Sequence, residues 1–183
     1  MTTATQPAIS TWTIDQAHST VEFSVKHMMI STVKGRFRNF EGTARIDEVD
    51  PSASSVTASV DVGSVDTGVE QRDAHLRSDD FFNAESFPKL TFVSSAVEQV
   101  DDENWKLAGD LTMRDVTRPV VFDVEVEGRG NDPYGKERAG FVATSKINRG
   151  DYGINFNGLM EAGGVVVGDS VKVTLNLELV RED

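Results

Sequence analysis

Apolar and polar residues alternate along most of the chain with a period of two, which is typical of strands buried on one face and wet on the other. Val21, Phe23 and Val25 alternate with polar neighbours, and the same contrast runs through residues 55–62 and 171–179. Glycine and Asn or Asp residues separate these segments, as expected for turns between sequential strands. The pattern predicts an all-β protein of about eight antiparallel strands.

A β-hairpin is predicted near the middle of the chain. Apolar side chains occupy alternate positions in residues 105–113, and do so again in residues 116–126 after the Arg114-Asp115 pair. Pro119 falls inside the second strand of this hairpin. Because proline lacks the amide N–H that a strand ladder requires, we expect a bulge or an unpaired stretch there.

One segment interrupts the alternation. Residues 71–82 are rich in charged and aromatic side chains and predict a short helix, in which Asp73 and Arg77 would have the i, i+4 spacing of an ion pair. Such a helix could form a lid, with Leu76 covering an apolar interior and the charged face meeting water or a phosphate. Alternatively, it plugs the closed end of the fold with its own salt bridges.

Two further local pairings are predicted. Arg149 and Asp151 would form an ion pair across a turn, and Gly153 would follow with a positive φ angle. Asp15 and His18 would form a hydrogen bond near the start of the fold. Both elements are expected to be structural.

Closing the strands into a barrel removes the exposed edges that an open sheet would leave. A barrel of about eight strands is wide enough either to be filled by side chains or to hold one slender ligand. Small and aromatic residues are mixed at the positions expected to face inward, namely Gly35, Ala58, Gly109, Ala143, Phe23, Phe37, Phe92, Phe122 and Phe141. On its own, this mixture favours ordinary packing of large against small side chains over an open tunnel.

Length and charge narrow the possible classes of protein. The chain of 183 residues suits one domain, for which we expect a flexible tail at residues 1–10 and a barrel at residues 11–183. The net charge of -12 would repel nucleic acid and anionic membrane surfaces unless basic residues were segregated into a patch, and the Lys and Arg residues are scattered along the sequence. We therefore expect no nucleic-acid partner.

The sequence also bears on where the protein is expected to act. No apolar run approaches the length of a membrane span, and residues 1–7 lack the charged and apolar regions of a secretory signal. This predicts a cytoplasmic protein, or a periplasmic or secreted one if the chain has been trimmed. The absence of cysteine excludes disulfides and thiolate metal sites.

Several short motifs together resemble the YceI-like family, and they extend along nearly the whole chain from residue 12. The densest lies at residues 75–88, which contain a His-Leu-Arg-Ser run, paired phenylalanines and a Phe-Pro step. The others are Trp12-Thr13-Ile14-Asp15, His18-Ser19, Val25-Lys26-His27, Gly109-Asp110-Leu111-Thr112 and the run Arg149, Asp151, Tyr152, Gly153.

This resemblance implies an antiparallel β-barrel of lipocalin-like shape that holds a long apolar ligand, commonly a polyisoprenoid or a fatty-acid amide. It reverses the preference for a filled barrel. It further implies a protein that carries or sequesters lipid without bond chemistry, needs no cofactor and forms a homodimer.

The candidate site combines an apolar cavity with a polar mouth. The residues expected to line the apolar cavity are Phe23, Val25, Met28, Phe37, Leu76, Phe81, Phe82, Phe92, Leu111, Phe122 and Phe141. The lipid head group is expected to meet His27, Arg72 and His75, because alternation places His27 at the end of an apolar wall and a guanidinium bonds two phosphate oxygens at once. For His27, a neutral side chain satisfied by a backbone carbonyl is the alternative.

An enzyme is not expected. The sequence lacks His-x-His, His-Glu-x-x-His and Gly-x-Ser-x-Gly motifs and has no phosphate-cradling glycine loop. There are two alternatives to a lipid carrier. The first is a filled barrel that acts as a stress-related protein-interaction module, and the second, less favoured one is a metal-dependent hydrolase.

Overall fold

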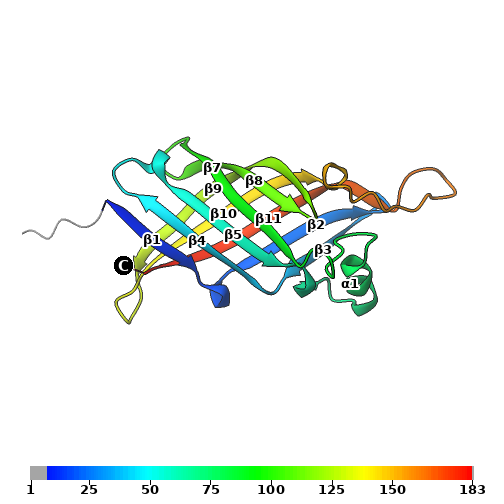
Figure 1. The fold of residues 1–183 in the computed structure, drawn as a ribbon, viewed down its shortest axis with the longest axis horizontal. Helices are drawn as coiled ribbons and strands as arrows, with labels where there is room; N and C mark the ends of the chain where they lie inside the picture. Colours follow the sequence, from blue (N-terminus) through cyan, green and yellow to red (C-terminus); the bar gives the residue numbers. More distant parts are fainter. Residues whose placement is uncertain (1–7, 183) are drawn as a thin grey trace, which may run out of the picture.

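The structure, a computed structural model, describes residues 8–182 and is dominated by one continuous antiparallel sheet (Figure 1). Its strands are β1 (Ile9–Ile14), β2 (Thr20–His27), β3 (Ser31–Phe37), β4 (Phe40–Asp47), β5 (Ser55–Asp61), β6 (Val65–Asp66), β7 (Lys89–Gln99), β8 (Asn104–Met113), β9 (Val116–Asn131), β10 (Glu137–Asn148) and β11 (Val167–Arg181). The helices are α1 (Glu70–Arg77) and the 3-10 turns η1 (Gln16–His18), η2 (Pro51–Ala53), η3 (Val62–Ser64) and η4 (Arg149–Tyr152).

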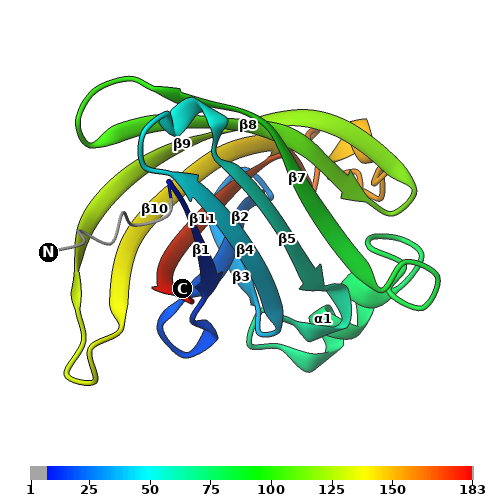
Figure 2. The same cartoon turned by 60° about the vertical axis from the view of Figure 1, so that its left-hand side comes forward.

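The sheet closes into a barrel. Strands β1, β4, β5, β7, β8, β9, β10 and β11 are hydrogen-bonded in that order, and β11 pairs back with β1, so the ring has eight strands (Figure 2). The chain bends at η1, so that β11 pairs with β1 at one end and with β2 further along its length. Strands β2, β3 and β6 extend the wall beyond the ring, on the same end of the molecule as α1 (Figure 1). The predicted antiparallel barrel is confirmed.

The predicted central hairpin is confirmed. Arg114 has a φ angle of 57° in the tight turn between β8 and β9, and Met113 pairs with Val116. Pro119 pairs with Asp110 of β8, but the β9–β10 ladder ends with the Thr144–Asp123 pair. The β10 side of Pro119 therefore has no ladder partner in the described part of the chain, as its missing N–H predicts.

The predicted helix is shorter than expected. Helix α1 ends at Arg77 because the backbone N–H and the hydroxyl of Ser78 both bond to the carbonyl oxygen of His75, the hydroxyl at 2.6 Å. The predicted Asp73–Arg77 ion pair is wrong. Asp73 is buried and accepts hydrogen bonds from the amide and the hydroxyl of Thr67.

Strand β1 begins within the segment predicted to be a tail. Ile9 pairs with Asp47, and Ser10 has no exposed surface. Residues 1–7 lie outside the described residues.

The interior is not one filled core. Three separate apolar clusters line the barrel, one around Trp12, one around Phe37 and one around Phe92 with Phe122. Inward-facing side chains packed against these clusters, including Ala58 and Val60, are only half-buried. Because native cores normally reach crystal-like packing density, half-buried inward residues indicate unfilled space. The filled barrel favoured by the residue pattern alone is therefore wrong.

The aromatic wall depends on glycine at position 109. A Cβ atom on Gly109 would lie 2.5 Å from Cζ of Phe92 and 2.5 Å from the carbonyl oxygen of Val93. We expect Gly109→Ala to lower the free energy of unfolding by about 1–3 kcal/mol through overpacking. Gly128→Ala is the matched control, since a Cβ there meets nothing within 4 Å. Urea unfolding of both variants measures the difference, and equal stabilities would contradict the packing argument.

Candidate functional site

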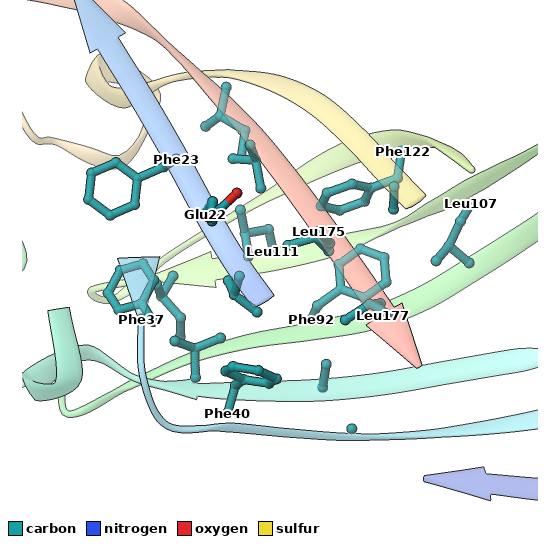
Figure 3. A pocket seen from close by; sticks show the side chains of 18 of the residues that line it. Glu22, Phe23, Phe37, Phe40, Phe92, Leu107, Leu111, Phe122, Leu175 and Leu177 are labelled. Carbon is teal, nitrogen blue, oxygen red and sulfur yellow. The ribbon is translucent and has the colours of Figure 1, made fainter. Parts of the chain in front are cut away.

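The barrel encloses an apolar cavity of about 840 Å³. Alternate residues of its strands point their side chains into this space, so its wall is made largely of phenylalanine, leucine and valine (Figure 3). Phe23, Phe92, Phe122, Leu111 and Leu175 converge on it from five strands. Pockets of about 300–1,000 Å³ lined by such residues are the usual form of a small-molecule site.

Nearly all of the apolar residues selected from the sequence line the cavity. Those that line it are Phe23, Val25, Phe37, Leu76, Phe81, Phe82, Phe92, Leu111, Phe122 and Phe141. Met28 is not among the lining residues. It lies in the β2–β3 turn with a φ angle of 52°, where strand alternation no longer determines which way a side chain points.

The three residues selected for head-group contact also line the cavity, at the end where α1 and the β2–β3 turn lie. We call this end the mouth. His27 is the last residue of β2, pairs with Val167 and is exposed. Arg72 and His75 come from α1, so two segments far apart in the sequence bring the three side chains to one end of the barrel.

Arg72 is held in place by one residue. Its Nε donates to the hydroxyl of Thr67 at 2.7 Å, and its Nη2 donates to the carbonyl oxygen of Thr67 at 2.9 Å. None of the ion pairs found within 4.0 Å among the described residues includes Arg72. Since a guanidinium has five N–H donors, this half-buried cation keeps unused donors at the cavity wall.

His75 lies in an aromatic cluster. Its ring meets Phe81 edge-on at 5.0 Å and Phe156 edge-on at 4.7 Å, measured between centroids. Its Nε2 lies 2.8 Å from a carboxylate oxygen of Asp80. The carboxylate thus fixes the orientation of the His75 ring. All three rings of the cluster line the cavity at the mouth.

A second mouth element, residues 154–166, was not identified from the sequence. Arg149, only 5% exposed, anchors this loop by donating to the carbonyl oxygens of Ile154, Phe156 and Gly168 at 2.8–2.9 Å. Burial lowers the pKa of the Arg149 guanidinium. The sequence shows only an arginine beside the glycines at positions 150 and 153. Its burial and its carbonyl partners are set by tertiary structure.

The predicted Arg149–Asp151 ion pair is wrong. The carboxylate paired with Arg149 belongs to Asp169, at 3.7 Å, and Asp151 is exposed. The positive φ angle predicted for Gly153 is confirmed at 74°.

Trp12 and Arg129 pack against each other away from the mouth, and both line the cavity. The indole of Trp12 is fully buried and donates to the Ser10 hydroxyl at 2.8 Å, and the Arg129 guanidinium lies 5.0 Å from the ring centroid. Glu48 and Glu137 pair with Arg129 and raise its pKa, while Arg129 lowers the pKa of both carboxyls. The Arg129 guanidinium and the two carboxylates are therefore paired within the protein, without a ligand.

Asp15, His18 and Glu178 form a cluster whose ligand atoms lie within 4.8 Å of one another. The Asp15 carboxylate accepts a hydrogen bond from Nδ1 of His18 at 2.9 Å as predicted, and the Arg138 guanidinium donates to the carboxylates of Asp15 and Glu178 at 2.6 Å. Hydrogen bonds from His18 and then Arg138 hold the Asp15 pKa at about 2. Because a guanidinium already neutralises the carboxylates, the cluster is better described as an ion-pair network than as a metal site.

The Arg149 anchor can be tested directly. Arg149→Met should lower the free energy of unfolding by about 2–5 kcal/mol, because buried carbonyl oxygens lose their donors. Hydrogen exchange of residues 154–167 should also accelerate. Asp169→Asn is the control, since that carboxylate is 76% exposed and its loss should cost less than about 1 kcal/mol. Equal effects of the two variants would show that the carbonyl bonds are not what fixes the loop.

In the described part of the chain, no helix is both long and apolar enough to span a membrane.

Comparisons with known proteins agree with this geometry. A UPF0312 protein of Staphylococcus aureus is 41% identical over 171 residues, which cover 93% of this chain and 97% of that protein.

Solved structures share the fold. The crystal structure of Burkholderia cenocepacia BcnA matches with a TM-score of 0.79 and 24% identity over 90% of this chain and 98% of that one. A polyisoprenoid binding domain from Saccharophagus degradans matches with a TM-score of 0.69 and 16% identity over 93% and 98%. The model of the YceI-like domain matches residues 12–179, and the chain therefore belongs to the YceI-like family.

Proposed function

We propose that the barrel binds a long-chain amphiphilic lipid, of the polyisoprenoid or fatty-acid amide type, and sequesters or carries it without bond chemistry. The observation that carries this proposal is the apolar cavity of about 840 Å³, bordered at its mouth by polar side chains. An apolar chain would fill the interior, and its head group would lie at the mouth.

Burial of the chain supplies the free energy of binding. Each methylene removed from water contributes about 0.8 kcal/mol, so a partly enclosed prenyl or acyl tail outweighs the cost of association. The half-buried inward residues, such as Ala58 and Val60, would lose their remaining exposure against this tail. The Saccharophagus degradans domain of the same fold, described as polyisoprenoid binding, supports this class of ligand.

The mouth favours a head group that accepts hydrogen bonds. Arg72 offers unused donors and a positive charge that no described carboxylate neutralises within ion-pair distance, and it lines the cavity. His27 and His75 add imidazole groups at the same end. A phosphate or an amide carbonyl would fit this set, and an anionic oxygen would gain most from the arginine.

Organic extraction of the natively purified protein, followed by mass spectrometry against a matched blank, tests the proposal. We expect about one prenyl or fatty-acyl lipid per chain. Val173→Trp should expel most of it, because Val173 lines the cavity and the larger ring occupies the space of the tail. Lys172→Trp adds the same ring to the exposed face of the same strand and should leave the lipid content unchanged. An empty extract, also after incubation with prenyl lipids, would reject lipid binding.

The role of Arg72 predicts a selective effect. Arg72→Gln should weaken binding of a prenyl phosphate about tenfold and leave the affinity for the prenol of equal length nearly unchanged, because only the charged head group uses the guanidinium. Arg77→Gln is the matched control on the same helix, since Arg77 pairs with Glu70 at 2.7 Å. Competition binding with both lipids gives the ratio, and an equal loss for both would assign Arg72 a structural role.

A further inference from the structure

Two segments at the mouth project exposed apolar side chains into solvent. The β2–β3 turn exposes 66% of Met29 and 78% of Ile30, and the loop of residues 154–166 exposes 91% of Leu159. Figure 1 shows this loop, in orange, extending beyond α1 along the long axis of the molecule. We call the β2–β3 turn and this loop together the apolar prong.

The two halves of the prong are joined by backbone hydrogen bonds. The amide of Met28 donates to the carbonyl oxygen of Val166 at 2.8 Å. Asn157 ties the loop to itself, because its side-chain oxygen accepts from the amides of Val166 and Val167 at 3.0 Å and its side-chain nitrogen donates to the carbonyl of Val167. The exposed side chains are thus presented by an organised backbone, and adjoining exposed apolar residues mark an interaction site.

The prong is nearly free of the negative charge that dominates the rest of the chain. Residues 23–35 contain Lys26 and Lys34 and no acidic residue, and Glu161 is the one acidic residue in positions 153–168. The formal net charge of the whole protein is -12. Because charges beyond about 8–10 Å are largely screened at physiological salt, the charge of the prong itself decides which surface its tip can approach. It is suited to a neutral or anionic surface.

The prong is continuous with the cavity. His27, directly before the β2–β3 turn, and Phe156 and Val166 of the loop all line the cavity. A lipid tail leaving the mouth would therefore pass along apolar side chains. A lipid bilayer can both accept the exposed apolar side chains and exchange the tail with the cavity.

We propose that the apolar prong inserts into the surface of a lipid bilayer and places the cavity mouth against the membrane. Met29, Ile30 and Leu159 enter the boundary between head groups and acyl chains, and Lys26 and Lys34 lie at the level of the head groups. The inference rests on the proposed function for the cargo that crosses the mouth, but bilayer binding itself is a separate property.

Vesicle co-sedimentation of the full chain tests this inference. The probes are phosphatidylcholine vesicles with and without about 30% phosphatidylglycerol. We expect the protein to bind both, with higher affinity for the anionic vesicles. The triple substitution of Met29, Ile30 and Leu159 by serine should weaken binding about tenfold or more, because the inserted apolar surface is removed. Lys26→Gln with Lys34→Gln should abolish the preference for phosphatidylglycerol.

The control removes exposed apolar residues elsewhere. Val49 is 82% exposed and Tyr134 is 93% exposed, and both lie in loops outside the prong. Replacing both by serine should leave vesicle binding unchanged. Since all five apolar positions are exposed, thermal unfolding should be similar for the two multiple variants and the unchanged protein.

The outcomes separate this inference from the proposed function. Absence of vesicle binding, or equal binding of the prong variant and the control variant, would overturn bilayer insertion. So would a dimer that the prong substitutions dissociate, because a second copy would then cover the prong. Lipid extraction from the same preparations reports on the cavity independently, so vesicle binding by a lipid-free protein would support insertion while rejecting the proposed cargo.

Discussion

The pairing of β11 back onto β1 is the constraint on which the rest of the structure depends. It fixes an eight-stranded ring. Because successive side chains of a strand point to opposite faces, every second side chain of each strand then points into one interior. The inward side chains do not fill that ring, since residues such as Ala58 stay half-buried, so closure leaves a cavity. Trp12 packs under Arg129 away from the mouth. The two ends of the barrel therefore differ, and the remaining features make sense with respect to the mouth.

Strands were predictable because alternation is a local property of the sequence. The hairpin turn at Arg114 and the unpaired edge at Pro119 followed from backbone chemistry that neighbouring residues do not override. Helix α1 was harder, because its end and its charge pairs depend on contacts made outside the helix. Thr67 takes the Asp73 carboxylate that i, i+4 spacing had assigned to an arginine, and Ser78 ends the helix through the His75 carbonyl. Nothing in the spacing of charges indicates which of these contacts forms.

The candidate site was predictable to a similar extent. Strand alternation and the family resemblance together selected apolar residues that all line the cavity except Met28, which failed because it follows the end of β2. Whether the barrel was filled or hollow could not be decided from residue types, since the answer is a small difference between the ring's volume and the summed volume of its side chains. The loop of residues 154–166 was missed for a related reason. The partners of Arg149 are backbone carbonyls, which leave no mark on the sequence.

The distribution of charge gives the two ends different roles. Arg129 and Arg138 each satisfy more than one carboxylate, so the charges around them are balanced by the protein itself. At the mouth, by contrast, Arg72 is held by Thr67 alone, and the residues beyond it are apolar and exposed. An unbalanced cation beside an apolar cavity and exposed apolar side chains would each be unfavourable in a protein that met only water. A single amphiphile offers a partner for the cation and for the cavity, and a bilayer offers one for the prong. Under both proposals, lipid completes the mouth, as a ligand inside the barrel and as a bilayer in front of it.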